Sequence, residues 1–205
     1  MSSLLDEEVP PVNPLGMAVI EELGRCFLEQ FSPETLVCPR ALDVLRLVDE
    51  LMPEFGIHVY PASRAEIGDR DGATDPKGNG EIAILVAETV WDQLELPPPR
   101  NYYARTTVCH EIGHAILHVP ILRRRLLISD VLARTQRSRL RAYEDPEWQA
   151  WAFAGTILMP SVTLQMLGAQ GARLTPSAVS AKYEVSAQMA SSHLRRLKWI
   201  GNTDA

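Results

Sequence analysis

Cysteine is scarce in this sequence, and its spacing argues against two kinds of site. The chain has 205 residues but only 3 cysteines, Cys26, Cys38 and Cys109. No two of them form a Cys-x-x-Cys pair, the spacing typical of cysteine-based metal sites. An odd number of widely separated cysteines also argues against a disulfide framework. We therefore expect free thiols, most of them in the core.

Long apolar runs and a secretory leader are lacking too. The longest apolar runs, such as residues 82–87, are far shorter than the roughly 20 residues that a membrane-spanning helix needs. The first 20 residues carry Asp6, Glu7 and Glu8, with no basic segment followed by a long apolar one. Neither an internal repeat nor a low-complexity tract is visible. We expect a cytoplasmic globular protein without a membrane partner.

Charge is distributed unevenly along the chain. Residues 1–100 contain 7 Lys+Arg and 19 Asp+Glu, whereas residues 101–205 contain 13 and 7. An anionic partner, if there is one, would bind the basic second half. Ion pairing between the two halves of the molecule explains the same distribution equally well.

The pattern of apolar residues predicts two helices after a short tail. Residues 1–15 contain three prolines in an acidic setting, which predicts a flexible tail. Apolar residues then recur at helical spacing in residues 17–31 and again in 39–52, and Pro53 ends the second helix.

Strand signals follow the two helices. Residues 57–60 and 81–87 are apolar and rich in β-branched residues, and the segment 69–80 between them contains Asp-Gly and Asn-Gly turn signals. These signals predict a small antiparallel sheet. A long helix should begin after Pro99. We therefore expect an α+β fold that is mainly helical.

The sequence His110-Glu111-Ile112-Gly113-His114 in this helix has the pattern His-Glu-x-x-His. At 3.6 residues per turn, His110 and His114 lie on one face, about 6 Å apart along the axis, where both imidazoles can bind one Zn²⁺. Glu111 lies one residue around the helix, where its carboxylate can take a proton from a water molecule that the metal activates. The pattern predicts metal-assisted peptide hydrolysis. Two incidental histidines on an exposed helix would be the alternative.

A catalytic zinc needs a third protein ligand from elsewhere in the chain. His118 is eight residues beyond His110, about 12 Å along the axis, so we expect it to support the site or to lie in the core rather than to bind the same ion. Asp145 and Pro146 predict the start of another helix, in which Glu147 shares a face with two alanines. We expect Glu147 to complete a His/His/Glu site, with Glu144 as the rival ligand.

Three segments together resemble the ImmA/IrrE family of bacterial metallo-endopeptidases. They are TTVCHEIGHAILH at 106–118, EWQAWAFAGTILMP at 147–160 and YEVSAQMASSHLRRLKWIG at 183–201, and the resemblance covers about residues 42–201. Two positions depart from the family pattern. Trp151 stands where the family usually has Asn, and Glu184 stands in a turn where glycine is common.

This resemblance implies a function and a domain organisation. It implies a zinc-dependent endopeptidase, with manganese as the alternative ion, that cleaves a helix-turn-helix transcriptional repressor and so derepresses genes of stress responses or mobile elements. His110, His114 and Glu147 would be the ligands and Glu111 the general base. The metallopeptidase domain would span residues 16–170, and 171–205 would form a helix-turn-helix-like segment packed on it.

A run of arginines lies between the His-Glu-x-x-His motif and Glu147, and it is a candidate surface for contact with a protein substrate or DNA. A solvated helical face would explain the same residues. The run consists of Arg123, Arg124, Arg125, Arg134, Arg137, Arg139 and Arg141.

Residues 176–183 and 186–198 have the pattern of a helix-turn-helix. Base contacts would come from the second helix, from Gln188, Ser191, Ser192 and His193. Direct DNA binding is the less favoured expectation, because in the resembled family this helical pair commonly packs against the catalytic core.

Two questions stay open on the sequence alone. Candidate electrophiles for the tetrahedral intermediate can be named, but none is assigned; they are Tyr102, Tyr103, Tyr143 and His193. The alternative to an enzyme is a non-catalytic, antitoxin-like regulatory protein that binds a repressor or DNA. The presence of Glu111 favours catalysis, because a purely structural metal site needs no general base.

Overall fold

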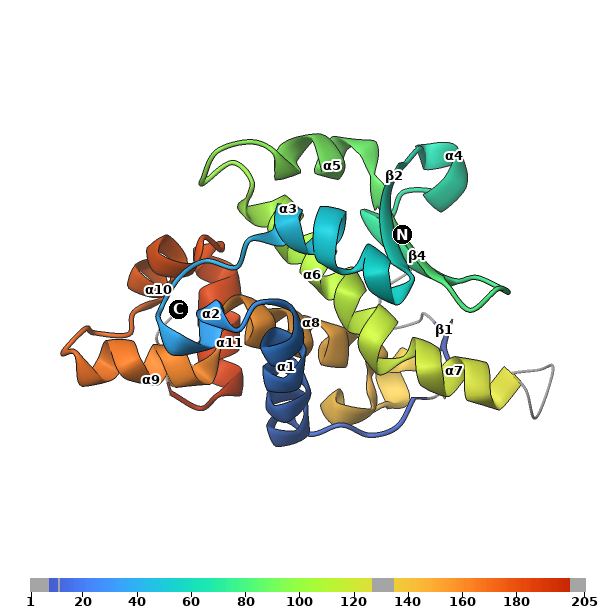
Figure 1. The fold of residues 1–205 in the computed structure, drawn as a ribbon. Coiled ribbons are helices and arrows are strands. Elements are labelled where there is room, and N and C mark those ends of the chain that lie inside the picture. The colour runs from blue at the N-terminus through green and yellow to red at the C-terminus, as the bar shows by residue number, and fades with distance from the viewer. Residues whose placement is uncertain (1–7, 11, 127–134, 200–205) are drawn as a thin grey trace.

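A computed structural model describes residues 8–10, 12–126 and 135–199, apart from the side chains of Arg125, Leu126 and Thr135. These residues form a mainly helical fold with one three-stranded sheet and one two-stranded ribbon (Figure 1). The predicted α+β class is therefore confirmed.

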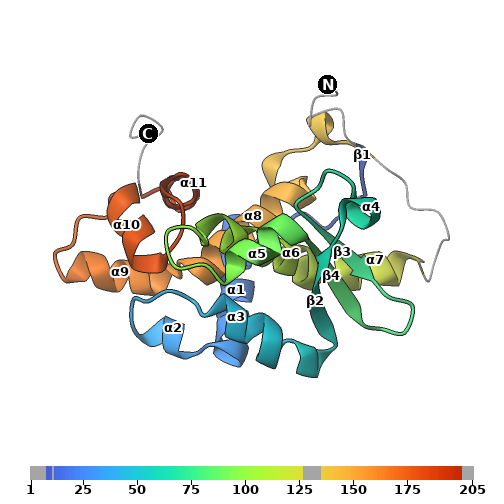
Figure 2. The same cartoon turned by 90° about the horizontal axis from the view of Figure 1, so that it is seen from above.

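The described residues form eleven helices and four shorter helical turns, and the C-terminal helices lie at the end of the molecule away from the three-stranded sheet (Figure 2). The helices are α1 (Met17–Phe31), α2 (Glu34–Val37), α3 (Val44–Arg46), α4 (Arg64–Ile67), α5 (Glu88–Leu94), α6 (Tyr102–Leu117), α7 (Val119–Leu126), α8 (Pro146–Leu158), α9 (Ser161–Ala169), α10 (Pro176–Tyr183) and α11 (Ala187–Arg196). The shorter turns are η2 (Leu47–Leu51), η3 (Pro53–Phe55), η4 (Arg137–Arg139) and η5 (Ala142–Glu144).

Helices α6 and α8 pack against each other through the middle of the molecule (Figure 2). Gly113 on α6 makes the close approach possible, because a Cβ at this position would lie 2.9 Å from the carbonyl oxygen of Ala150 and 3.0 Å from its Cα. The small side chain of Ala150 on α8 also permits this close approach. Helix α1 covers α8 from the other side.

The sheet differs from the predicted antiparallel arrangement. Its strand order is β2 (Ile57–Ala62), β4 (Ile82–Ala87), β3 (Gly72–Pro76), with β2 parallel and β3 antiparallel to β4. The prediction was wrong because turn signals show where a chain reverses, not which strands pair. The helical turn α4, which begins with a Ser63–Glu66 capping box, connects β2 to β3. Because of this connection β3 does not pair with β2 but lies on the other side of β4.

The second predicted helix also begins later than expected. Residues 39–43 are not helical, and α3 begins only after Asp43, whose side chain accepts a hydrogen bond from the backbone N–H of Arg46. The chain continues as the π-helical turn η2 up to Met52. The first predicted helix, at Met17–Phe31, is confirmed.

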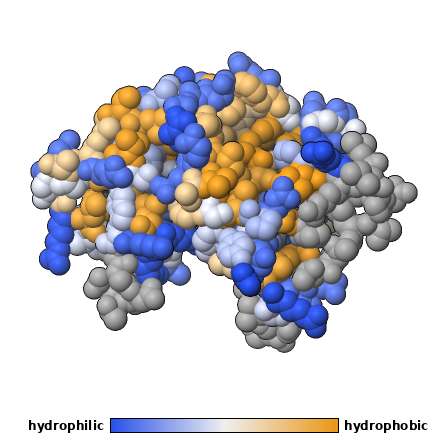
Figure 3. All heavy atoms as spheres, turned by 90° about the horizontal axis from the view of Figure 1, so that it is seen from below, coloured by the Kyte–Doolittle hydropathy of each residue, from blue (hydrophilic) through white to orange (hydrophobic). Residues whose placement is uncertain are grey.

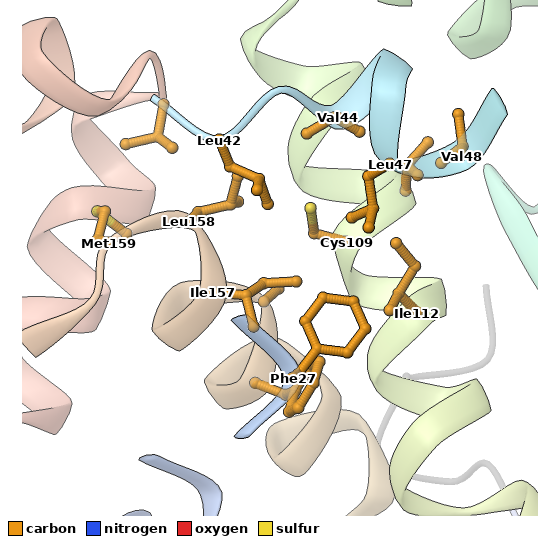
Figure 4. Packing of buried hydrophobic residues seen from close by; sticks show 14 of the residues in the cluster. Phe27, Leu42, Val44, Leu47, Val48, Cys109, Ile112, Ile157, Leu158 and Met159 are labelled. Atoms are coloured by element: carbon orange, nitrogen blue, oxygen red, sulfur yellow. The ribbon is translucent and has the colours of Figure 1, made fainter. Parts of the chain in front are cut away.

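The main core lies between α1, α3, α6 and α8 (Figure 4). Cys109 of α6 faces Leu158 of α8 and the side chains around α3, and Ile112 lies further along the same helix. Burial raises the pKa of the Cys109 thiol to about 12, which makes it unreactive. All three thiols are free as expected, but Cys26 and Cys38 are exposed, so the expectation that most lie in the core was wrong.

Part of the predicted flexible tail is packed against the domain. The strand β1 (Glu8–Val9) pairs antiparallel with β5 (Thr135–Gln136). Val9 and Val12 are buried. The prolines around them were interpreted as a sign of a flexible segment. Proline is, however, tolerated at the end of a short edge strand, so it does not exclude β1. Residues 1–7 and 11 lie outside the described part of the chain.

The C-terminal helices α10 and α11 pack on the core through α8. His193 of α11 is fully buried and lies with Nε2 3.1 Å from the carbonyl oxygen of Met159. Its ring fills the space over Gly155, where a Cβ would come within 2.5 Å of Nδ1. The buried guanidinium of Arg105 on α6 donates to the carbonyl of Glu184 at 3.1 Å. Glu184 itself has φ +55°, which explains why glycine is common in this turn.

The burial of His193 predicts acid sensitivity of the fold. Burial lowers its pKa to about 3, so below pH 6.5 the unfolded chain takes up a proton that the folded chain cannot bind. This contribution to stability is intact above pH 6.5 and is lost as pH falls toward 3. At pH 5 it amounts to about 2 kcal/mol, at 1.36 kcal/mol per pKa unit.

Urea unfolding of the metal-free protein at pH 7 and pH 5 measures this effect. We expect wild type to lose about 2 kcal/mol more stability than His193→Leu between the two pH values. An equal loss in both proteins would show that His193 is not the group responsible.

Two features of the surface complete the description. Among the described helices, no single one is long and apolar enough to cross a membrane; only the bent pair α8 and α9 meets that test of length and composition, and most of α8 is buried in the core. Apolar side chains gather on the face shown in Figure 3. The exposed large apolar residues include Val19, Leu23 and Val162, none of which lines the cleft described next.

Candidate metal centre

The predicted ligands converge at the contact between α6 and α8. His110 and His114 lie one turn apart on α6, and their Nε2 atoms are 3.1 Å apart. Glu147 Oε2 lies 3.2 Å from His110 Nε2, and Glu147 Oε1 lies 3.2 Å from His114 Nε2. These three side chains form the group in the described part of the chain that could hold a metal ion.

Local sequence at the start of α8 aims Glu147 at the histidines. The side chain of Asp145 caps the helix by accepting from the backbone N–H of Glu147 at 3.0 Å, and Pro146 occupies the first helical position. Arg137 holds the cap with a 2.9 Å ion pair to Asp145. Glu147 is therefore presented from the first turn of a helix whose start is fixed by its neighbours.

The spacing of these atoms fits a divalent metal. Four ligands around a tetrahedral ion, each about 2.0–2.1 Å from it, lie about 3.3 Å from one another. The observed 3.1–3.2 Å separations come close to this value. Two imidazoles and one carboxylate with an open fourth position are also the donor set of a catalytic rather than a structural zinc site.

Burial and hydrogen bonding shift the pKa values of the cluster in opposite directions. Burial by itself raises the pKa of Glu147, but hydrogen bonds from His110 and His114 outweigh it, and the pKa lies far below its usual range. Burial lowers the pKa of His114, but the hydrogen bond and charge of Glu147 outweigh it, so this pKa is raised. Because a metal ligand must be deprotonated, acid opposes metal binding here.

The two histidines are held in different ways. The ring of Trp151 lies over that of His110 with centroids 4.1 Å apart, and the buried His110 Nδ1 has no hydrogen-bond partner among the described residues. His114 Nδ1 lies 3.0 Å from His118 Nδ1. His118 thus contacts a candidate ligand without joining the cluster, as its spacing predicts.

Glu111 lies under the edge strand β3. Thr74 donates from its hydroxyl to Glu111 Oε2 at 2.9 Å, and the same hydroxyl is 3.1 Å from the carbonyl oxygen of Glu111. Gly72 leaves room for the carboxylate, because a Cβ at this position would lie 2.7–2.9 Å from Cγ, Oε1 and Cδ of Glu111. The strand therefore fixes the position of the predicted general base.

This close contact predicts a strong effect of Gly72→Ala. The added methyl group must displace either β3 or the Glu111 carboxylate, and a displacement of about 1 Å can cost 100-fold in rate. We expect hydrolysis of a fluorogenic peptide library to fall by about 100-fold while Zn²⁺ affinity stays unchanged, because Glu111 is not in the ligand cluster. Gly78→Ala, in the adjacent hairpin with no atom within 4 Å of its Cβ, is the matched control. Equal activity of the two variants would refute the argument.

The cluster opens into a cleft of about 770 Å³. Its walls are α6, β3, the start of α8 and the N-terminal segment with Glu8, Val9 and Val12. Among the four residues considered as electrophiles, Tyr103 lines this cleft, and its hydroxyl donates to Asp71. The side chains of Tyr102 and Tyr143 do not line the cleft, and His193 is buried against Met159.

Glu144 and most of the described arginines lie away from the cluster, although Arg137 lines the cleft. Glu144 caps its own turn by accepting from the backbone N–H of Arg141. Arg123 donates to the carbonyl oxygen of Gly80 at 2.7 Å in the β3–β4 hairpin, and Arg137 is used by the α8 cap. The exposed arginines are Arg124, Arg139 and Arg141. The side chain of Arg125 and all of Arg134 lie outside the described residues.

The residues considered for DNA contact do not form one exposed face. Ser191 and His193 are buried, Ser192 is partly buried and Gln188 is exposed. Half of the expected base-reading side chains of α11 therefore face the protein core.

Three residues beside the cluster were missed by sequence reasoning. Gly72 and Thr74 contact Glu111 from 37 or more positions away in the chain, and Gln149 bonds His118. A Gly in a turn-rich segment and a lone Thr carry no signal of such a role, although Gln149 lies only two residues after Glu147.

Comparison with known proteins agrees with this geometry. Residues 100–195, which include both helices of the cluster, match the family model of the IrrE N-terminal-like domain, Peptidase_M78. No curated protein and no solved structure matches the chain. Over residues 100–195 the chain is therefore similar to the ImmA/IrrE family of metallopeptidases, the family that its motifs resemble.

Proposed function

We propose that this protein is a zinc-dependent endopeptidase that cleaves a helix-turn-helix transcriptional repressor in the cytoplasm. The observation that carries the peptidase part of the proposal is the convergence of His110, His114 and Glu147 to within 3.2 Å, with Glu111 beside them at the floor of an open cleft. The family supports a metallopeptidase of this general kind.

Each side chain of the site has a distinct task in this proposal. His110, His114 and Glu147 hold the zinc ion, which when bound acts as a Lewis acid and lowers the pKa of water. Glu111 accepts the proton of the attacking water at its carboxylate and later returns it to the leaving amine. Thr74 keeps one oxygen of Glu111 in place by its hydrogen bond, which leaves Oε1 for proton transfer.

The cleft is suited to an extended peptide segment. Strand β3 is an edge strand that pairs only with β4 in the described sheet, and Gly72, Ala73 and Thr74 line the cleft. Unpaired N–H and C=O groups of an edge strand can hydrogen-bond an extended chain whatever its side chains. This favours a protein substrate over a small molecule.

The repressor as substrate rests on the family resemblance. A survey of new protein N-termini by mass spectrometry, in host cells expressing either wild type or Glu111→Gln, tests it. We expect a few new termini that occur only with wild type and lie within a helix-turn-helix repressor.

Other results of the survey would change the assignment. New termini in unrelated proteins would keep the peptidase and refute the repressor. Their complete absence, together with full Zn²⁺ binding by the purified protein, would favour a non-catalytic regulatory protein that binds a repressor or DNA.

A further inference from the structure

Buried side chains connect the metal cluster to the N-terminal segment. His114 Nδ1 lies 3.0 Å from His118 Nδ1, and His118 Nε2 lies 3.0 Å from Gln149 Oε1. Gln149 Nε2 in turn donates to the carbonyl oxygens of Asn13 at 2.9 Å and Tyr143 at 2.7 Å. His118 and Gln149 are buried, with exposed fractions of 3% and 0%.

The two carbonyl oxygens fix the orientation of the Gln149 side chain. A carbonyl oxygen only accepts hydrogen bonds, so the amide nitrogen of Gln149 must face Asn13 and Tyr143. Its amide oxygen then faces His118, and because this oxygen also only accepts, His118 Nε2 must carry the hydrogen. In a neutral imidazole the other nitrogen, Nδ1, is then an acceptor.

The hydrogen-bonding role of His118 Nδ1 also fixes the tautomer of His114 in the metal cluster. His118 Nδ1 can accept only if His114 Nδ1 donates, and this leaves the lone pair of neutral His114 on Nε2. That atom is the one that lies 3.1 Å from His110 Nε2 and 3.2 Å from Glu147 Oε1. Followed from Gln149, the hydrogen bonds permit one set of neutral tautomers, and it is the set that metal binding needs.

We propose that Gln149 and His118 are positioning residues that hold His114 in the tautomer with its lone pair on Nε2, and so increase the affinity of the cluster for a divalent metal. The proposal rests on the metal site proposed above. Within the described residues His114 is the ligand histidine whose Nδ1 has such a partner, since His110 Nδ1 has none there and the ring of His110 packs against Trp151 instead.

Zn²⁺ affinity, measured by competition with a chromophoric chelator, tests the proposal. Gln149→Leu and His118→Phe each break the chain of hydrogen bonds, and we expect each to weaken Zn²⁺ binding by roughly 10- to 100-fold, as is usual when the partner of a ligand histidine is lost. Tyr183→Phe is the matched control. It removes a buried 2.9 Å hydrogen bond to Thr163 on the other side of the core, so its affinity should equal that of wild type.

The metal-free wild type gives a second readout that does not depend on a variant folding. Long-range ¹H–¹⁵N spectra should show His118 with its hydrogen on Nε2 and none on Nδ1. A hydrogen on His118 Nδ1, or Zn²⁺ affinities of both variants within about twofold of wild type, would overturn the role of Gln149 and His118 while leaving the metal site intact. Failure of wild type to bind Zn²⁺ would overturn both proposals.

Discussion

Glu111→Gln is expected to slow peptide hydrolysis by at least about 100-fold, while the protein still binds metal. The substitution keeps the size of the side chain, and its amide oxygen can still accept from Thr74, but it cannot take a proton from water. Loss of a positioned general base typically costs 10²- to 10⁴-fold in rate, so we expect kcat to fall by about that factor.

The measurement is the rate of cleavage of the substrate found by the N-terminus survey, with Zn²⁺ affinity determined on the same samples. Glu111 is not in the ligand cluster, so the affinity should change little. Glu144→Gln is the control for loss of a nearby carboxylate, since Glu144 bonds only its own turn and should leave kcat unchanged. Cleavage by Glu111→Gln at the wild-type rate would exclude Glu111 as the base.

Glu147→Ala is expected to remove metal binding itself. It deletes the one ligand that α8 contributes and leaves two imidazoles on α6. Even the loss of a group that merely supports a ligand costs 10- to 100-fold in metal affinity, so loss of a ligand should cost more than about 100-fold. Activity should be lost in parallel at limiting Zn²⁺.

Glu144→Ala separates this effect from a general effect of charge near α8. Glu144 is the other carboxylate that the sequence offered as third ligand, and it lies outside the cluster. Its variant should bind Zn²⁺ like wild type. If Glu147→Ala bound as tightly as Glu144→Ala, the His/His/Glu site would be wrong.

The contrast between these carboxylates shows why part of the site was predictable. His110, Glu111 and His114 lie within one turn and a half of helix, so their relative positions follow from helix geometry alone. Asp145 and Pro146 mark where the next helix begins, which places Glu147 in its first turn. Motifs of this kind are local, and local geometry can be worked out from spacing.

The sheet and the N-terminal segment show where such reasoning ends. The turn signals in residues 69–80 were identified, but the parallel pairing of β2 with β4 depends on where α4 carries the chain. The proline-rich composition of residues 1–15 gave no sign that Val9 and Val12 are buried beside the cleft. Which distant segments pair depends on which strand edges and apolar surfaces the rest of the fold leaves uncovered. A short stretch of sequence does not contain that information.

By itself the sequence determined the α+β class, the helix with the metal-binding motif, the resemblance to a metallopeptidase family and the candidate ligands. Only the tertiary structure decided that Gly72 and Thr74 hold Glu111, and that Gln149 and His118 support His114. The physical reason is that a metal ligand or a general base needs a particular chemical group, which can be recognised from the residue type. The residues that orient this group act through contact with it. Contacts between segments far apart in the chain form only when α6, α8 and β3 pack together.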